Sequence, residues 1–358
     1  MKKKQTICYV AGKSGGHIIP CLTFAREHKE KHPEDNILFF TTETILDIEI
    51  VTNSPDINWH IPLPLNNVLL KKWHNIFTAG FNMALTMMKS LFYLIKHRPN
   101  KIVCTGGFLA IPVIICARIL AIPVQLYELN VEPGRATRFL ASWSIDLFTC
   151  FEQTQAYLPQ KKCIKTSYPI RFFGESAQIS QKDALQKLLF SPERKTICIL
   201  GGSQGSLEIN HLMQQWIVQH PHLHEQIQII HQTGRQDSFN WKAFYTQHNI
   251  THHVFSFSHE MAIYYAAADL IICRSGAGTL FEILFFGKQC ITIPLQTPTN
   301  NHQVTNALAM QEEYGELFTT ITKEQLTHNK QALSHHIMDK LKLNTMQSET
   351  APYISKEL

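Results

Sequence analysis

Residues 5–20 read QTICYVAGKSGGHIIP, and residues 195–206 read KTICILGGSQGS. Each stretch begins with an apolar run of the length of a buried strand, continues through a glycine-rich loop and enters a segment with helical apolar spacing. A strand, a tight glycine turn and a helix form the opening unit of a parallel α/β sheet. Because this unit occurs once in each half of the chain, the sequence predicts two α/β domains.

Strand-like runs alternate with helical segments along the rest of the chain, which favours a parallel sheet in each domain. A change of pattern near residues 167–175 predicts a first domain over 1–168 and a second over 169–339, and we consider that the tail, 340–358, packs back on the first domain. Open parallel sheets bind ligands at the carboxyl ends of their strands, so two such domains facing one another would form a cleft there. Further strands are expected at 36–41, 102–105, 124–128, 227–233, 253–257, 270–273 and 289–294.

Composition excludes several classes of protein. The 358 residues are 44% hydrophobic and 17% charged, which rules out a disordered chain, and the net charge of +5 is too small for a dedicated nucleic-acid binder. The charge is uneven, with a net +7 up to Tyr168 and −2 from Pro169 onward. Residues 57–127 contain seven Lys or Arg and no Asp or Glu. A basic, apolar segment of this kind indicates contact with an anionic surface.

Cysteine spacing and targeting signals point to a reducing, intracellular location. The nine cysteines include no C-x-x-C pair, so buried thiols are expected rather than disulfides or a zinc site. The apolar run after Met1–Lys4 is too short for a secretion signal, and the apolar stretch 102–126 is interrupted by Gly, Pro and Arg118. No D-x-D motif is present to hold a metal on a nucleotide. His220, His222 and His224 resemble a metal cluster, but the neighbouring Pro221 favours an ordinary loop. We therefore expect neither a metal nor a cofactor.

The first glycine loop, residues 12–17, suits a phosphate or a developing negative charge, because glycine allows close backbone approach and a helix N-terminus offers free N–H groups. It does not match a P-loop, since Ile7 stands where the first glycine belongs. Ser14 and Ser203 stand where a dinucleotide fingerprint needs its second glycine, which disfavours a nicotinamide enzyme. His17 follows the loop directly, either as a general base or as a side chain that caps the loop.

Three features of the second half suit a nucleotide sugar. The loop 201–206 is either an anion site or a simple tight turn, and 274–279 is a third glycine-rich turn. Glu282 follows one helical turn later, where it is either an acceptor for two ribose hydroxyls or an ordinary acidic residue near a helix start. The polar run 296–303 could bind a sugar, although alone it reads as an ordinary loop.

Taken together and in order over residues 5–315, these motifs resemble one family, the MurG transferases, which add N-acetylglucosamine to lipid I to give lipid II in peptidoglycan synthesis. The motifs that carry the resemblance are Ser14–Pro20, Thr105–Pro112, Glu128 with Asn130, Gly201–Gly205, Cys273–Ala277, Glu282, His302-Gln303 and Asn306-Ala307. The resemblance implies a GT-B glycosyltransferase fold, an α/β architecture in which two Rossmann-like parallel-sheet domains face one another across a cleft. The first domain would hold the lipid-linked acceptor and the second UDP-N-acetylglucosamine.

The resemblance also implies an inverting, metal-independent transfer to O4 of the N-acetylmuramyl group. His17 would take the proton of the acceptor hydroxyl, with Glu128 as the second candidate or as a structural residue. The turn 258–261 would meet the uracil, with Ser258 acting through its backbone, while Glu282 would bind the ribose and Gln303 the sugar hydroxyls. The full donor- and substrate-binding set is Ser14, Gly15, Gly16, Asn130, Arg171, Ser203, Gly205, Ser258, Met261, Ala277, Gly278, Thr279, Leu280, Phe281, Glu282, His302 and Gln303.

The chain departs from the family pattern at several positions. Tyr168 stands where the family has Asn, and Gly278 where it has a larger apolar residue beside the nucleotide. The other departures are Lys13, Ser14, Ile111, Tyr127 and Leu129. Lys13 could add a positive charge at the diphosphate of the donor or of the acceptor.

The acid-free segment matches the need to reach a lipid-bound substrate. We expect Lys71, Lys72, Trp73 and Lys89 to contact an anionic bilayer, and we expect a peripheral protein at the cytoplasmic face of the inner membrane. The alternatives are another GT-B lipid glycosyltransferase, such as a diacylglycerol sugar transferase, a UDP-N-acetylglucosamine 2-epimerase, and a donor-binding scaffold without activity.

Overall fold

The computed structural model describes residues 4–12, 15–65, 74–143, 146–202, 205–297, 301–329 and 331–343. The chain folds into two compact units. Unit 1 comprises Met1–Ala177, Ser275–Phe285 and Leu295–Tyr314. Unit 2 comprises Gln178–Arg274, Phe286–Pro294 and Gly315–Leu358.

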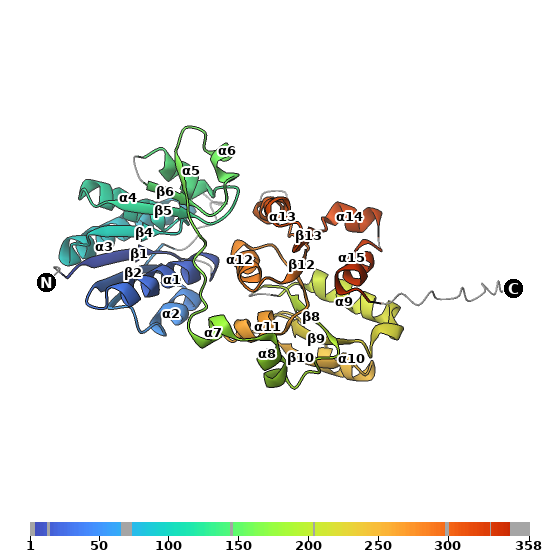
Figure 1. Ribbon diagram of the computed structural model, residues 1–358. Helices are drawn as coiled ribbons and strands as arrows, with labels where there is room; N and C mark the ends of the chain where they lie inside the picture. Colours follow the sequence, from blue (N-terminus) through green and yellow to red (C-terminus); the bar gives the residue numbers. More distant parts are fainter. Residues whose placement is uncertain are drawn as a thin grey trace. The chain divides into compact units, whose positions relative to one another are not determined.

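Unit 1 contains a seven-stranded parallel sheet with the strand order β3-β2-β1-β4-β5-β6-β7 (Figure 1). The order runs outward in both directions from the neighbouring pair β1 and β4, as in a doubly wound sheet. Its strands are β1 (Thr6–Val10), β2 (Asn36–Thr42), β3 (Trp59–Leu63), β4 (Lys101–Cys104), β5 (Val124–Glu128), β6 (Asp146–Thr149) and β7 (Cys163–Lys165). Its helices are α1 (Gly15–Lys31), α2 (Ile45–Thr52), α3 (His74–His97), α4 (Ala110–Ile119), α5 (Arg135–Ala141), α6 (Thr154–Tyr157), α12 (Ala277–Phe285) and α13 (His302–Glu313), with α7 (Glu175–Gln178) at the boundary.

Both faces of this sheet are covered, because alternate residues of each strand point to opposite sides. In β1, Ile7 and Tyr9 pack in one core with α1 and α2, while Cys8 and Val10 pack in the other core with α3 and α4. Figure 1 shows the two pairs of helices on opposite sides of the strands. Strands β1, β2 and β4 are therefore buried along most of their length, which is why they could be predicted from short apolar runs.

Unit 2 contains a six-stranded parallel sheet with the order β10-β9-β8-β11-β12-β13, which reverses between β8 and β11. Its large core joins residues of β8, β9, β11 and β12 to α9, α10 and α15. The strands are β8 (Lys195–Leu200), β9 (Ile227–Gln232), β10 (Thr251–Phe255), β11 (Leu270–Cys273), β12 (Gln289–Thr292) and β13 (Phe318–Thr320). The helices are α8 (Gln181–Leu188), α9 (Leu207–Gln219), the 3-10 turn η1 (Pro221–Leu223), α10 (Trp241–Gln247), α11 (Met261–Ala267), α14 (Lys323–His328) and α15 (Ala332–Leu341).

The two parallel α/β sheets expected from the sequence are confirmed. The strand expected at 253–257 begins two residues earlier, at Thr251, where its pairing with β9 starts. The edge strands β3, β7 and β13 were not among the predicted strands. β7 and β13 have only three residues each, and β3 contains Pro62, a residue that sheets accept mainly at their edges.

The end of the chain is described as far as residue 343. Leu341 closes α15 and is buried in the core of unit 2, whereas residues 344–358, most of the predicted tail 340–358, lie outside the described residues. Among the helices that the structure describes, none has the length and apolar character needed to cross a membrane.

Gly205 is a position where the second glycine loop requires glycine. Its φ is +81°, and a Cβ there would lie 2.6 Å from Cα of Gly234 and collide with the carbonyl oxygen of Thr233. We expect Gly205→Ala to lower the free energy of unfolding by about 2 kcal/mol or more, through backbone strain and the collision.

Gly80→Ala is the matched control for this substitution. Gly80 lies inside α3, and a Cβ added to it would meet no neighbouring atom within 4 Å. The same change should therefore be neutral or stabilise by up to about 1 kcal/mol. Urea denaturation of both variants measures the difference, and equal effects would contradict the prediction.

Candidate active site

The predicted glycine loops follow the strands at which the order of each sheet reverses. In unit 1, β1 leads into the loop before α1, and β4 leads into Thr105, Gly106 and Gly107. In unit 2, β8 leads into residues 201–206, and β11 ends directly before Arg274. The helices that leave such neighbouring strands turn away in opposite directions, so the strand ends stay open to a ligand.

His17 lies in the first turn of α1 and is held by the loop after β4. Its Nδ1 lies 2.7 Å from the carbonyl oxygen of Thr105, and the Thr105 hydroxyl donates to the carbonyl oxygen of His17 at 2.9 Å. Because a carbonyl oxygen only accepts hydrogen bonds, Nδ1 of the imidazole carries the proton. This hydrogen bond leaves Nε2 as the nitrogen that can accept a proton, which is the arrangement that a general base needs.

Glu128 ends β5 and is 4% exposed. Its Oε1 accepts hydrogen bonds from the backbone N–H of Asn130 at 3.1 Å and from the Asn130 side chain at 3.2 Å. Its Oε2 accepts from the backbone N–H of Gly134 at 3.1 Å. The carboxylate thus ties together the loop between β5 and α5, and this geometry favours the structural alternative for Glu128 over a role as the base.

Asn130 is joined to α13 through the buried side chain of Asn306. The Asn306 amide donates to Oδ1 of Asn130 at 3.0 Å, and its Oδ1 accepts from the backbone N–H of Val131 at 2.9 Å. Ser275, which is fully buried, donates to the carbonyl oxygen of Gln303 at 2.7 Å. Asn306 is only 1% exposed and was not among the predicted site residues, although its motif was recognised. It fixes the position of Asn130.

Gln303 lies in the first turn of α13, directly after His302. Its side-chain Oε1 accepts a hydrogen bond from the backbone N–H of Leu295 at 2.9 Å. This bond turns the amide so that Nε2 is the end left for a ligand, and that nitrogen has two N–H donors. An amide nitrogen held in this way suits sugar hydroxyl oxygens.

Glu282 and Arg171 form a two-point ion pair in unit 1. Nε of Arg171 lies 2.7 Å from Oε1 of Glu282, and Nη2 donates to Oε2 at 3.1 Å. The Glu282 side chain is 9% exposed and that of Arg171 is 30% exposed. The pair orients the carboxylate, while each carboxylate oxygen has two acceptor positions and so retains capacity for hydroxyl groups.

The first turn of α12 contains the predicted residues 277–281. Leu280 is fully buried, and the Phe281 ring packs against Phe151 at 5.0 Å between centroids, so these two side chains belong to the packing of the helix. Leu280 N–H bonds to the carbonyl oxygen of Gly276, whereas the backbone N–H groups of the turn before it have no partner inside the helix. Ala277, Gly278 and Thr279 therefore present backbone donors rather than side chains.

In unit 2, a buried network of polar side chains supports residues 233 and 234, which lie next to Gly205. Asn210 of α9 donates to the carbonyl oxygen of Thr233 at 3.0 Å and accepts from Nε2 of His231 at 3.0 Å. The Tyr245 hydroxyl donates to Nδ1 of His231 at 2.9 Å. Burial lowers the pKa of His231 to about 3, so the ring is neutral. The sequence signal for this network was a histidine within the apolar strand β9.

Arg274 joins the end of β11 to the start of α9. Its guanidinium donates to Glu208 at 2.7 Å and to the carbonyl oxygen of Ile293 at 2.9 Å. The pair holds the N-terminal turn of α9, which follows the second glycine loop, close to the strand ends of unit 2. Ser206 caps that helix by accepting from the N–H of Ile209.

Ser258 and Met261 lie in the turn between β10 and α11. The Ser258 hydroxyl accepts from the N–H of Glu260 at 3.0 Å and from the Tyr264 hydroxyl at 3.3 Å. Met261 begins α11 and is buried. The side chain of Ser258 is thus engaged within the turn, and its role toward a ligand through the backbone stays a prediction.

Several predicted residues lie outside the described residues, namely Lys13, Ser14, Lys71, Lys72, Trp73 and Ser203. Gly15 and Gly16 begin α1. Lys89 is exposed on α3 and lies 3.4 Å from Glu43.

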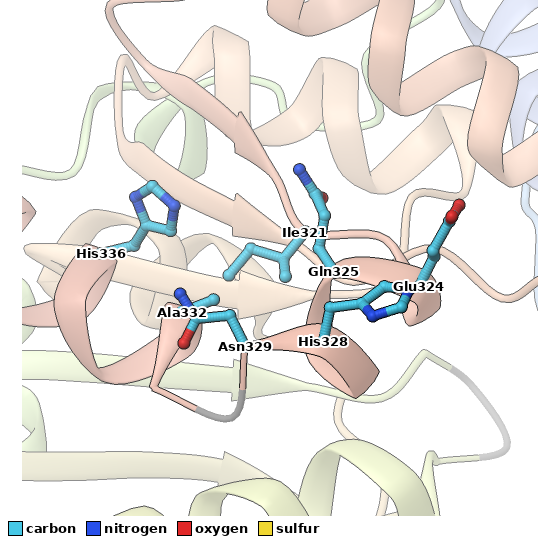
Figure 2. Close-up of a pocket in the computed structure, with 7 residues that line it drawn as sticks. All are labelled: Ile321, Glu324, Gln325, His328, Asn329, Ala332 and His336. Atoms are coloured by element: carbon cyan, nitrogen blue, oxygen red, sulfur yellow. The ribbon is translucent and has the colours of Figure 1, made fainter.

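The cavity drawn in Figure 2 contains none of the predicted site residues. It lies in unit 2 where α14 and α15 meet, and its lining includes two histidines and one acidic side chain. Within the described part of the chain, no three His, Cys, Asp or Glu side chains gather as a metal site would require. The lining residues are Ile321, Glu324, Gln325, His328, Asn329, Ala332 and His336.

The nine cysteines are free thiols, and eight of them are buried, as expected from their apolar surroundings. Burial raises the pKa of Cys8 and Cys21, and it raises the pKa of Cys104 to about 12. These thiols near the first glycine loop are therefore protonated and act as small apolar groups.

Comparisons with known proteins agree with the fold and the motifs. The glycosyltransferase family 28 N-terminal domain matches residues 7–148, and the C-terminal domain of the same family matches residues 196–358. The chain is thus a glycosyltransferase built from the two family 28 domains.

A curated protein of Protochlamydia amoebophila, named UDP-N-acetylglucosamine--N-acetylmuramyl-(pentapeptide) pyrophosphoryl-undecaprenol N-acetylglucosamine transferase, is 31% identical over 309 residues, which are 83% of this chain and 78% of that protein. The crystal structure of Acinetobacter baumannii MurG has a TM-score of 0.70 at 22% identity and covers 95% of this chain and 91% of that one. A putative UDP-N-acetylglucosamine 2-epimerase from Listeria monocytogenes has a TM-score of 0.62 at 12% identity, with coverages of 95% and 88%. The fold is therefore shared with epimerases.

The chain belongs to the MurG family of N-acetylglucosaminyltransferases, the enzymes of this type in peptidoglycan synthesis.

The geometry of Glu128 leads to a stability prediction. We expect Glu128→Gln to lower the free energy of unfolding by about 1–3 kcal/mol, because an amide NH₂ group would then face N–H donors that now share a carboxylate. Thermal and urea unfolding measure the loss.

The control is Glu132→Gln, which removes an exposed ion pair with Arg138 from the same loop. Exposed pairs contribute about 0–1 kcal/mol, so this change should have little effect. A Glu128→Gln variant as stable as the unmodified protein would contradict the role of Glu128 in holding its loop.

Proposed function

We propose that the chain transfers N-acetylglucosamine from UDP-N-acetylglucosamine to O4 of the N-acetylmuramyl group of lipid I, with inversion at the anomeric carbon and without a metal ion. Membership of the MurG family supports this substrate pair, because the curated relatives are named for it. The observation that carries the mechanism is the His17 ring, which the Thr105 carbonyl oxygen holds with Nε2 as its free acceptor.

The donor would be bound by groups that the structure has already oriented. Glu282, held by Arg171, would accept the two vicinal hydroxyls of the ribose. Gln303, whose Oε1 is taken by Leu295, would donate from Nε2 to the hydroxyls of the sugar. The turn 258–261 of unit 2 would meet the uracil, with Ser258 acting through its backbone and Met261 nearby.

The leaving group would be stabilised by the partial positive charge at helix N-termini. UDP departs with negative charge, and backbone N–H groups at the start of α12 and in the loop before α9 are donors that favour such charge. Arg171 adds a guanidinium next to the carboxylate of Glu282, the expected ribose ligand. Donors placed in advance in this way can replace a metal ion at a departing diphosphate.

The chemical step is a single displacement. O4 of the acceptor attacks the anomeric carbon while the bond from that carbon to the UDP oxygen breaks, which inverts the α-linkage to a β-linkage. Nε2 of His17 takes the proton of O4, and UDP leaves with the bonding electron pair. Asn130, fixed by Glu128 and Asn306, would contact the sugar and hold its position during the transfer.

The outer face of α3 would bring unit 1 to an anionic bilayer. Met83, Met87, Leu91 and Leu94 pack inward against the core, so α3 is attached to the sheet by one face. The opposite face exposes large apolar side chains: Phe81 is 68% exposed, Met88 65%, Phe92 60% and Ile95 51%.

Basic residues lie beside this apolar face, and their charge favours an anionic surface as its partner. Lys89, Lys96 and Arg98 lie on or just after α3, in a segment without acidic residues. An apolar stripe beside lysines suits an anionic lipid surface better than a neutral one. We propose that the enzyme works at the cytoplasmic face of the inner membrane as a peripheral protein, where its lipid-linked acceptor is anchored.

The proposed reaction is tested with purified protein, labelled UDP-N-acetylglucosamine and three acceptor conditions. Lipid I should yield labelled lipid II with one UDP released per transfer, and the product should contain a β-linkage. Transfer to diacylglycerol instead, or formation of N-acetylmannosamine without acceptor, would replace the proposal with a lipid glycosyltransferase or an epimerase. Chelation of divalent cations should leave the rate unchanged.

His17→Ala provides the mechanistic variant for the same assay. We expect kcat to fall by about 10²–10⁴-fold, the usual contribution of a general base, with the donor KM nearly unchanged. The control for loss of an imidazole is His28→Ala. His28 also lies on α1, but it is paired with Asp35. A His17→Ala variant with normal kcat would assign the base elsewhere.

Membrane contact is tested by flotation with vesicles of phosphatidylglycerol and phosphatidylcholine. Replacing Phe81 and Phe92 by Ser together with Lys89→Gln should weaken binding to the phosphatidylglycerol vesicles by about tenfold or more, because two apolar anchors and one cation are removed. Binding to pure phosphatidylcholine should be weak throughout.

Val218→Ser, at a residue of α9 in unit 2 that is 56% exposed, is the control for loss of an exposed apolar side chain. Unchanged vesicle binding of the α3 variant, with its unfolding temperature preserved, would rule out this face as the membrane contact.

A further inference from the structure

Tyr168 lies in the segment between β7 and α7 and is 9% exposed. Its ring stacks on Phe281 of α12, with 4.9 Å between centroids and 14° between planes. Phe281 in turn packs on Phe151, so the aromatic ring of Tyr168 is fixed against the helix from which Glu282 projects.

The hydroxyl of Tyr168 is directed at the first turn of α12. A Cβ at Gly278 would lie 2.9 Å from the Tyr168 hydroxyl oxygen, whereas the next nearest atom, Cζ of the ring, would be 3.7 Å away. The hydroxyl therefore occupies the space that a side chain at position 278 would fill. Any larger residue at 278 is incompatible with this tyrosine in its present position.

None of the described residues hydrogen-bonds the same hydroxyl, and its oxygen keeps some accessible surface although nine-tenths of the residue is buried. A ligand can therefore reach this hydroxyl and form a hydrogen bond with it. Burial and the negative charge of Glu282 raise the pKa of Tyr168, which keeps the hydroxyl protonated and able to donate. The positive charge of Arg171 acts in the opposite direction and does not reverse the shift.

We propose that Tyr168 is a donor-site residue whose hydroxyl hydrogen-bonds the ribose of a nucleoside diphosphate sugar beside Glu282, and that glycine at 278 makes room for it. Tyr168 and Gly278 are then a matched pair, because the hydroxyl fills the space that a side chain at 278 would need. The proposal rests on the proposed function, in which Glu282 is the ribose ligand. It adds a group from the segment before Arg171 to that subsite.

The test combines Tyr168→Phe and Gly278→Ala with the double variant, and measures the Kd of UDP-N-acetylglucosamine by calorimetry beside KM, kcat and unfolding temperature. Tyr168→Phe retains the stacked ring and should weaken donor binding about three- to tenfold, the usual effect of one hydrogen bond, with kcat little changed. Gly278→Ala alone should both lower the unfolding temperature and weaken donor binding, because its methyl group meets the tyrosine hydroxyl.

The double variant separates the steric effect from the hydrogen bond. Once the hydroxyl is removed, the new methyl group faces only Cζ at an ordinary contact distance, so Gly278→Ala should cost little in the Tyr168→Phe background. Tyr157→Phe, at an exposed tyrosine of α6, is the control for loss of a hydroxyl and should change none of the four quantities.

Each outcome decides the proposal. An unchanged donor Kd in Tyr168→Phe overturns the hydrogen bond, and an equal effect of Gly278→Ala in both backgrounds overturns the steric pairing. Failure of the proposed function looks different, because the unmodified protein would then bind UDP-N-acetylglucosamine without transferring its sugar to lipid I, or would not bind it. In the first case the Kd series still decides the role of Tyr168, and in the second case both proposals are wrong.

Discussion

The reversal of strand order beside β1 and beside β8 is the constraint on which the site depends. At each reversal the connections leave in opposite directions, so the carboxyl ends of two neighbouring strands remain uncovered. Only short loops with glycine can fit there, and those loops lead into helix N-termini with free backbone N–H groups. The strand order thus explains why one chain has a glycine-containing loop before a helix N-terminus in both of its units.

Buried polar side chains then give those loops one conformation. Glu128, Asn306 and Ser275 are nearly inaccessible, and each is satisfied by hydrogen bonds to backbone or side-chain groups of the loops around it. His231 and Asn210 do the same for the end of β9, where Asn210 bonds the carbonyl oxygen of Thr233. Since an unpaired buried polar group costs about 1–3 kcal/mol, the networks favour a single arrangement over alternatives. Hydrogen bonds and an ion pair likewise hold the side chains of His17, Glu282 and Gln303 in one orientation.

Much of the site could be predicted from local sequence, and the exceptions have physical causes. His17, Glu282 and Gln303 follow recognisable loops, so their positions in the first or second turn of a helix were predictable. The role of Asn306 was not, because it depends on contact with Asn130, far away in the chain. Leu280 and Phe281 share the motif of Glu282, yet helical geometry turns their side chains into the packing. The sequence predicted only a basic, apolar segment at α3. It did not show which face of the helix is exposed, since periodicity alone does not reveal which side meets the sheet.

The sequence by itself determined the two parallel sheets, the glycine loops and the family, because strand apolarity and turn chemistry are local and the motifs keep their order. Tertiary structure decided which atoms of these residues remain available. It set the tautomer of His17 through Thr105, paired Glu282 with Arg171, engaged Glu128 within its own loop, and placed the Tyr168 hydroxyl at Gly278. Except for the bonds of Glu128, which stay within one loop, these contacts join residues that lie far apart in the chain. A hydrogen bond or a steric fit between them exists only once folding has brought the two partners within about 3 Å.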